Sequence, residues 1–340
     1  MHLFLKSLLF VSVLLMIAPA IETKLTEKRQ GASQAILCLT SQRVPYVDKT
    51  SPKWSQAQKP YNLRLSYQPA AITLPTLPKH VQDSVLCAAL SGLKVQAKSG
   101  GHSYASYSSG GQDGSVVIDM KTFNTVNVDQ GEGICCLWPL ITANNKSATW
   151  IAKVGTGVRV GNIALELYDQ GKRALPQGTC SGIGIGGSAT HGGYGYTSRK
   201  WGLTLDHIVA MDVILANGTE VHATETRFPD LFYALRGAAD SIGVVTYFYF
   251  RTLPAPNSVL VFSASLVPSL RDANTAATAF QKLQTFVLTS VLLTPNITFG
   301  MYTDSEGYFG ISGWCIDCDE QYFTNTVSYP FSTNLFSGLT

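Results

Sequence analysis

The chain has 340 residues, of which 45% are hydrophobic and 14% charged, and its formal net charge is +3. This composition is typical of a globular protein, excludes a disordered one, and leaves room for more than one hydrophobic core. Because the net charge is small and no basic run is interleaved with aromatic residues, the sequence gives no support to nucleic-acid binding.

The first twenty residues have the pattern of a secretory signal peptide. Lys6 precedes an apolar run at 8–17, and small residues of the A-x-A type follow at Ala18 and Ala20. The run is shorter than the roughly 20 residues that a membrane-spanning helix needs. We therefore expect a secreted, extracellular protein without a membrane span, in which residues 21–59 form an N-terminal arm.

Beyond the arm, segments of helical and strand periodicity alternate along the chain. In chain order we expect a helix at 78–92, strands at 95–97 and 116–120, a helix at 160–171 that ends on a glycine, a strand at 207–215, a hairpin turn at Asn217-Gly218 leading into Val221, a short helix at 229–236, a strand at 244–250 and, after Pro254 and Pro256, a helix at 270–288. The two prolines mark a domain boundary.

Seven cysteines are present, which in an oxidising compartment should mostly pair and must leave one over. Cys38 and Cys87 are the expected structural disulfide, which would join the arm to the helix at 78–92. Cys315 and Cys318 have the spacing of a zinc or thioredoxin motif, but no second ligand pair accompanies them, so a local disulfide or two free thiols are expected and no metal site. Sequons at Asn145, Asn217 and Asn296 fit a glycoprotein.

Two glycine-rich segments are the strongest candidates for a binding site. In Ser99-Gly100-Gly101 the backbone N–H groups can face an anion such as a diphosphate, and His102 follows at once. The second segment, 178–195, places Cys180 among eight glycines. Neither matches the dinucleotide or P-loop pattern. Three alternatives stay open: glycines that only serve turns, a buried structural histidine, and a Cys-His hydrolase pair of Cys180 with His102 or His191.

Three segments together resemble the secreted fungal oligosaccharide oxidases of the berberine-bridge-like flavoprotein group. Their first flavin loop is similar to residues 97–120, AKSGGHSYASYSSGGQDGSVVIDM. Their second flavin loop is similar to residues 174–218, which begin ALPQGTCSGIGIGG. The end of their FAD domain is similar to residues 230–256, DLFYALRGAADSIGVVTYFYFRTLPAP. The resemblance implies an α+β fold: a PCMH-type FAD-binding domain of two α/β subdomains at 60–256, then a partial α+β substrate-binding domain with an antiparallel sheet at 257–340.

The resemblance also assigns residues to an FAD that is attached by two bonds. It implies that His102 bonds to the 8α carbon and that Cys180 bonds through sulfur to carbon 6 of the flavin ring. Further residues are implied to line the cofactor: Ser99, Gly100, Gly101, Ser103 and Tyr104 on one side, and Gly186, Gly187, Gly193 and Val245 on the other. Tyr104 matches a position that faces the substrate, and Tyr302 and Tyr308 are candidates for sugar contacts.

The implied reaction oxidises the anomeric hydroxyl of an oligosaccharide to a lactone, while dioxygen is reduced to hydrogen peroxide. A secondary-metabolite oxidase of the alkaloid type on the same fold is the alternative. The family's catalytic base, a tyrosine with an acidic helper, belongs to a later segment than any present before Thr340. We therefore expect a C-terminally truncated chain in which no residue is assigned as the base, and an inactive FAD-binding fragment is a further alternative.

The segment 131–146 interrupts the resemblance and introduces Cys135 and Cys136. Its ends can be encoded by a splice-donor sequence and by a branch-point-like sequence with a terminal AG. Two interpretations stay open, a loop insertion and an intron translated in frame. Under the second, the sequon at Asn145 is spurious.

Overall fold

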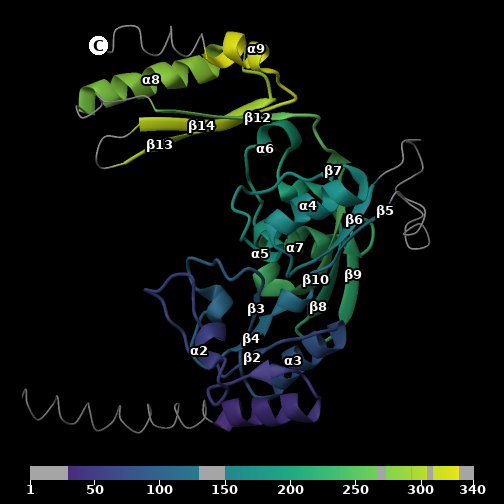
Figure 1. Ribbon diagram of the computed structural model, residues 1–340. Helices are drawn as coiled ribbons and strands as arrows, with labels where there is room; N and C mark the ends of the chain where they lie inside the picture. Colours follow the sequence, from purple (N-terminus) through teal and green to yellow (C-terminus); the bar gives the residue numbers. More distant parts are fainter. Residues whose placement is uncertain (1–29, 130–149, 266–272, 292, 305–308, 329–340) are drawn as a thin grey trace, which may run out of the picture.

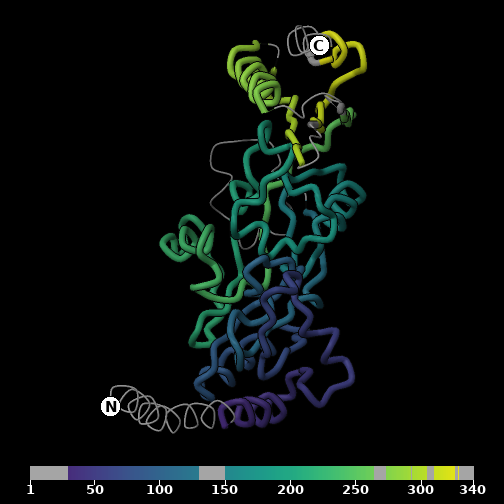
Figure 2. The backbone as a smooth tube through the Cα atoms, turned by 90° about the vertical axis from the view of Figure 1, so that its left-hand side faces the viewer, coloured from purple at the N-terminus to yellow at the C-terminus, as the bar shows by residue number. Residues whose placement is uncertain are grey.

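The computed structural model describes residues 30–129, 150–265, 273–291, 293–304 and 309–328. Figures 1 and 2 show three bodies stacked one above another, with the N-terminal body at the bottom and the C-terminal body at the top. The signal peptide, the segment 131–146 and Tyr308 lie outside the described residues. Within the described ranges, no helix is long and apolar enough to cross a membrane.

The bottom body contains a four-stranded sheet in the order β1-β2-β4-β3, in which β2, β4 and β3 are parallel and β1 is antiparallel to β2. Its elements are β1 (Tyr46–Val47), α2 (Trp54–Ala57), β2 (Ala71–Thr73), α3 (Pro78–Leu90), β3 (Val95–Lys98), η1 (Tyr107–Ser109), β4 (Val116–Asp119) and η2 (Met120–Thr122), preceded by a helix at 30–41. Pro78 occupies the first turn of α3, where its missing N–H costs nothing. A disulfide joins Cys38 to Cys87 and so ties helix 30–41 to α3.

The middle body contains an antiparallel five-stranded sheet in the order β5-β6-β10-β8-β9. Its elements are β5 (Val126–Asp129), β6 (Ile151–Gly155), α4 (Val160–Gly171), β7 (Arg173–Ala174), α5 (Ile185–Thr190), α6 (Ser198–Trp201), η4 (Thr204–His207), β8 (Ile208–Leu215), β9 (Glu220–Thr224), α7 (Pro229–Ile242), β10 (Gly243–Arg251) and β11 (Leu253–Pro254). Helices α4, α5 and α7 share one core with the sheet. Ile214 and Val244 instead join the core of α3, so the bottom body packs on the other face.

The segment 131–146 falls in a hairpin connection. Asp129 at the end of β5 pairs with Ile151 at the start of β6. Without 131–146, the two strands would be joined by residue 130 and residues 147–150, and links of two to five residues are the usual ones in β-hairpins. Both interpretations of the segment are therefore compatible with the sheet on either side of it.

The top body is a three-stranded antiparallel sheet, β12 (Val259–Ser265), β14 (Phe309–Ile316) and β13 (Ile297–Thr303), with helix α8 (Ala273–Thr289) on one face. Leu283 and Phe286 of α8 pack on Ile297 and Ile311. A short helix α9 (Glu320–Phe323) and a π-helical segment η5 (Thr324–Ser328) follow. In Figure 1 α8 lies on the side away from the rest of the molecule, so the opposite face of the sheet turns toward the middle body.

The α+β fold class predicted from the sequence is confirmed, and each predicted helix and strand is present within a few residues of its expected limits. Two details differ. The residue in the left-handed conformation at the end of α4 is Lys172 (φ 53°), which follows the expected Gly171. The predicted short helix at 229–236 ends at a kink, where Arg236, Gly237 and Ala238 are not helical, and a second helical segment follows to Ile242, so that α7 spans both; Gly237 adopts its φ of 149° without strain.

Candidate functional site

The two glycine-rich segments meet between the bottom and middle bodies. The His102 loop (residues 99–106) follows β3, and the Cys180 loop (residues 178–184) precedes α5. A Cβ atom on Gly100 would overlap the backbone N of Gly184, and one on Gly184 would overlap the backbone N of Gly100. The two backbones are therefore in van der Waals contact, which requires glycine on both sides.

Polar contacts hold the loops at this distance. The Ser99 hydroxyl donates to the Thr156 carbonyl (2.6 Å) and accepts from the Gly186 N–H (3.2 Å). One guanidinium nitrogen of Arg159, Nη1, donates to the Gly100 carbonyl (2.7 Å) and to the Gly182 carbonyl (2.6 Å). The loops are thus connected through a third segment, the one between β6 and α4.

His102 lies close to the Cys180 loop. The His102 ring is half-buried, and its Nε2 lies 3.8 Å from the position that a Cβ would take on Gly182, two residues after Cys180. Tyr61 stacks on the His102 ring, with 4.6 Å between the ring centroids. Among the described cysteines, Cys180 carries the free thiol, and it is exposed. The two loops in contact therefore carry a half-buried imidazole and an exposed thiol.

A pocket of about 310 Å³ adjoins His102. It is lined by Gln56, Lys59, Pro60, Tyr61, residues 98–102, Asp119, Lys121 and Arg159. Lys98 is 3.6 Å from Asp119 and also donates to the Ala57 carbonyl (3.0 Å). Four cationic side chains against one carboxylate give the pocket an excess of positive charge, which favours an anionic ligand.

The other predicted site residues divide into two groups, and the first group is Tyr104, Gly101 and Gly187. Tyr104 is 75% exposed, with its ring 5.6 Å from that of Tyr61, and its carbonyl accepts from the Asn62 side chain (2.6 Å). The backbone at Gly101 is left-handed (φ 79°). At Gly187 a Cβ would meet no atom within 4 Å, so the surface there is open.

The second group is used inside the protein. The Ser103 hydroxyl accepts from the Tyr107 N–H (3.1 Å), and a Cβ on Gly193 would overlap the Thr204 side chain. Val245 is 8% exposed and belongs to the core of the middle body, while its carbonyl accepts from the Thr156 hydroxyl (3.0 Å). For these residues the structure shows contacts inside the protein; Ser103 and Gly193 are half-buried, and Val245 is buried.

Sequence reasoning missed Arg159, Tyr61 and Lys98. Lys98 directly precedes the first glycine-rich segment, and this adjacency is a signal that could have found it. Tyr61 lies in a segment of irregular structure and Arg159 stands singly before a helix, so neither carries a motif.

The comparisons of sequence and of structure with known proteins agree with each other. A family model described as an FAD binding domain matches residues 69–224. A xylooligosaccharide oxidase of Thermothelomyces thermophilus is 44% identical over 229 residues, which are 67% of this chain and 43% of that protein. The chain spans about half the length of the curated relatives that it matches.

Two solved structures have the same fold over most of the chain. The xylooligosaccharide oxidase from Myceliophthora thermophila C1 in complex with xylobiose has a TM-score of 0.78 and 35% identity, covering 89% of this chain and 59% of that one. A glucooligosaccharide oxidase from Acremonium strictum, described with a 6-S-cysteinyl, 8α-N1-histidyl FAD, has a TM-score of 0.77 and 28% identity, covering 89% and 58%. The chain therefore carries an FAD binding domain, and its relatives in sequence and structure include oligosaccharide oxidases and berberine-bridge-like proteins.

Proposed function

We propose that the chain binds FAD through bonds to both His102 and Cys180 and forms the flavin-holding part of an oligosaccharide oxidase. The observation that carries this proposal is the contact between the His102 loop and the Cys180 loop, of which the first carries an imidazole and the second an exposed thiol. The Acremonium strictum relative, described with a cysteinyl and a histidyl bond to FAD, supports the same pair of attachments.

The residues at the site fit an FAD. The pocket beside His102 carries Lys59, Lys98, Lys121 and Arg159, which suit the two negative charges of a diphosphate. The absence of side chains at Gly182 and Gly187 leaves room for a flat ring system next to the two attachment residues. Ser99 already bonds Thr156 and Gly186 of α5, so in this proposal its part is to fix the His102 loop against the middle body.

When bound, the flavin would accept a hydride from the substrate carbon, and the protein would hold and orient it. His102 and Cys180 would anchor it in a site that is open to solvent. The exposed ring of Tyr104 offers an apolar face with a polar tip, which suits a sugar ring. The reaction also requires a general base for the hydroxyl proton, and we assign that role to no described residue.

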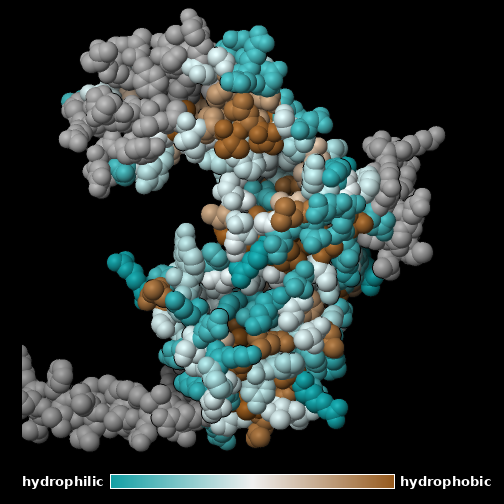
Figure 3. Space-filling view, in the orientation of Figure 1, coloured by the Kyte–Doolittle hydropathy of each residue, from teal (hydrophilic) through white to brown (hydrophobic). Residues whose placement is uncertain are grey.

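We propose that the substrate lies between this site and the top body. Figure 3 shows the surface hollowed between the top body and the bottom body. Ile297 and Phe299 of β13 pack toward α8. Successive side chains of a strand point to opposite faces of the sheet, so Gly300 and Tyr302 belong to the face away from α8. Tyr302 is 61% exposed, and Trp314 of the neighbouring strand shares this face through its pairing with Thr298.

The substrate class that we propose is an oligosaccharide whose anomeric hydroxyl is oxidised to a lactone, with dioxygen reduced to hydrogen peroxide. The test is to purify the full chain, precipitate it with acid and measure the flavin that stays attached. In native protein, oxygen consumption and peroxide formation are measured with xylo-, chito- and gluco-oligosaccharides. We expect His102→Ala and Cys180→Ala each to keep flavin through the remaining bond, and the double variant to release it.

The outcomes separate the parts of this proposal. A wild-type protein without flavin would contradict cofactor binding. A yellow protein that forms no peroxide with any oligosaccharide would contradict the oxidase assignment, and turnover of an alkaloid instead would support the secondary-metabolite alternative.

We further propose that the protein is secreted and glycosylated. Two disulfides, Cys38–Cys87 and Cys315–Cys318, are present, as expected in an oxidising compartment. Asn217 is exposed in the hairpin turn between β8 and β9, where a glycan would meet solvent, whereas Asn296 is half-buried. Recovery of the chain from culture medium, with a mass shift on glycosidase treatment, is the expected result, and retention inside the cells would contradict it.

A further inference from the structure

We propose that Arg159 is a positioning residue that sets the spacing of His102 and Cys180, so that one flavin can bond to both. This inference rests on the proposed function. Each carbonyl that Arg159 binds is two residues from an attachment residue, since Gly100 precedes His102 and Gly182 follows Cys180. A single nitrogen atom, Nη1, makes both bonds, so the two carbonyl oxygens are held against the same point.

The base of the Arg159 side chain is itself fixed by the Cys180 loop and α5. The N–H of Val160 donates to the Ile183 carbonyl (2.9 Å), and the N–H of Ile185 donates to the Val158 carbonyl (2.9 Å). Both valines that flank Arg159 are buried, with exposed fractions of 2%. The guanidinium therefore extends from a rigid segment and cannot follow the loops if they move apart.

The spacing of the loops is limited in both directions. They cannot come closer because the backbones of Gly100 and Gly184 are already in contact. They are kept from separating by the Arg159 bonds and by the Ser99 hydroxyl, and the Arg159 bonds are charge-assisted, hence about twice as strong as neutral ones. In addition, two carbonyl oxygens that face each other repel unless a positive group lies between them, which the guanidinium supplies.

Arg159 also lines the pocket beside His102, so a phosphate-binding role is the competing explanation. The two roles differ in what a lysine would do. A lysine would keep the positive charge, but its shorter side chain would not reproduce the reach of Nη1 to both carbonyl oxygens. A phosphate-binding role therefore predicts that lysine restores double attachment in full, and a positioning role predicts that it restores it only in part.

The chemistry of attachment explains why spacing matters. Each attachment breaks one N–H or S–H bond and one C–H bond of the flavin and forms one N–C or S–C bond. The two protons and two electrons released pass to dioxygen, which becomes hydrogen peroxide. Once one bond has formed, the second depends on where the other side chain stands, and a misplacement of about 1 Å can cost about 10²-fold in rate.

The experiment compares Arg159→Met and Arg159→Lys with the wild-type full chain. Purified protein is digested, and the peptides that contain His102 and Cys180 are weighed by mass spectrometry at successive times after flavin addition. For wild type we expect both peptides to carry flavin. For Arg159→Met we expect mainly one attachment, with the second forming about 10²-fold more slowly, and for Arg159→Lys an intermediate share of double attachment with near-normal total flavin.

Arg173→Met is the matched control. Arg173 also connects distant segments, donating to the Thr252 carbonyl (2.7 Å) and hydroxyl (3.1 Å), but it contacts neither loop. We expect it to lower the melting temperature about as much as Arg159→Met and to keep both attachments. A loss of double attachment in this control would mean that general destabilisation suffices, and would overturn the inference.

Two further results would also overturn it: wild-type rates of double attachment in Arg159→Met, or full restoration by Arg159→Lys. If Arg159→Met does not accumulate, Arg159→Lys alone decides the question. A wild-type protein without flavin would contradict the proposed function and this inference together. Wild-type double attachment combined with unchanged Arg159 variants would contradict this inference alone.

Discussion

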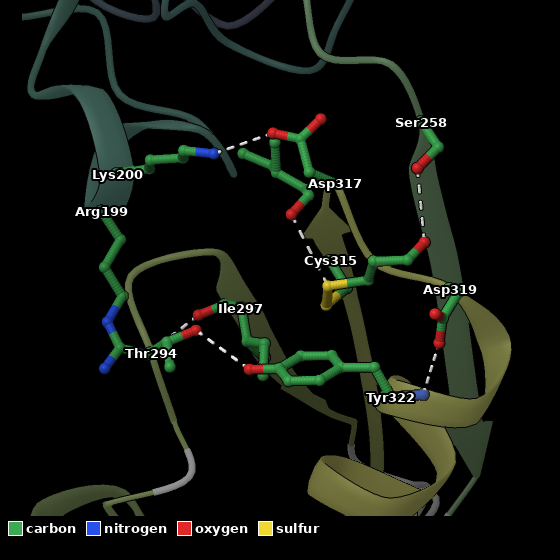
Figure 4. The surroundings of a disulfide bond; sticks show 11 residues. Arg199, Lys200, Ser258, Thr294, Ile297, Cys315, Asp317, Asp319 and Tyr322 are labelled. Atoms are coloured by element: carbon green, nitrogen blue, oxygen red, sulfur yellow. Dashed lines mark hydrogen bonds and ion pairs between the residues drawn. A yellow bond between two sulfur atoms is a disulfide. The ribbon is translucent and has the colours of Figure 1, made fainter.

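Besides the buried core that the bottom and middle bodies share, two junctions between the bodies differ in what crosses them. At the first, the His102 loop and the Cys180 loop touch through backbone, with glycine on both sides. At the second, between the middle and top bodies, long side chains cross the gap. Arg199 donates to the carbonyls of Leu293 (2.7 Å) and Ile297 (2.8 Å), and Lys200 pairs with Asp317 at 3.1 Å (Figure 4).

The difference matches what each junction has to do in the proposed function. Backbone contact leaves no freedom, because a single added carbon atom would overlap another atom, and two bonds to one ring require such fixed geometry. Long side chains can adjust when the surface they hold changes. The top body can therefore vary in sequence without disturbing the attachment site, which suits a wall that contacts the substrate.

The largest effect is expected at the first junction. The variant Gly184→Ala places a Cβ against the Gly100 N and the Ser99 hydroxyl, and such overpacking costs about 3 kcal/mol. The free energy of unfolding in urea measures the loss. Equal stability of this variant and wild type would show that the loops are not in contact.

Gly187→Ala is the comparison for that variant. Its Cβ would meet no atom within 4 Å, and alanine in a helix gains about 0.5–1 kcal/mol over glycine. We therefore expect unchanged or higher stability. Because Gly187 is proposed to line the flavin, we also expect less bound flavin, measured by absorbance; full flavin content would remove Gly187 from the site.

A smaller effect is expected from Arg199→Met at the second junction. The variant removes two charge-assisted hydrogen bonds to backbone carbonyls, a loss of about 2 kcal/mol. Limited proteolysis is expected to cut the link between β11 and β12 faster, while covalent flavin stays at the wild-type level. A loss of flavin in this variant would contradict the independence of the two junctions.

The smallest effect is expected from Asp317→Asn. Burial would raise the pKa of Asp317, but hydrogen bonds from Lys200 and from the Asn257 N–H hold its pKa below the usual 3.8. Because the pKa of Asp317 is lower in the folded than in the unfolded state, its carboxylate stabilises the fold at pH values above the unfolded-state pKa. This stabilisation is lost as the pH falls through the folded-state pKa. The side chains of this ion pair are partly exposed, so we expect about 0.5 kcal/mol.

Unfolding free energies of wild type and Asp317→Asn at pH 7 and pH 3 test this ion pair. The difference between them is expected to shrink at pH 3 and in high salt. A difference that stays the same at pH 3 would show that the carboxylate charge has no part in this junction.

Several features follow from short-range patterns in the sequence. The spacing of Val81 and Val85 identified α3, and the β-branched and aromatic run at 244–250 identified β10, because each depends on residues within one turn or one strand. Cys38–Cys87 was also predicted. His102 and Cys180 stood out since each is adjacent to glycines in the chain itself, and the disulfide at Cys315–Cys318 was one of two expectations left open.

The tertiary structure alone decided how those residues are used. Arg159 reaches carbonyls 59 and 23 residues away, and Tyr61 meets His102 across the chain, so no local pattern identifies either. Glycine is equally visible in sequence at Gly187 and Gly193, yet the missing side chain leaves open space at one and admits Thr204 at the other. A sequence records that a side chain is absent, but only the packing of distant segments decides what fills its place.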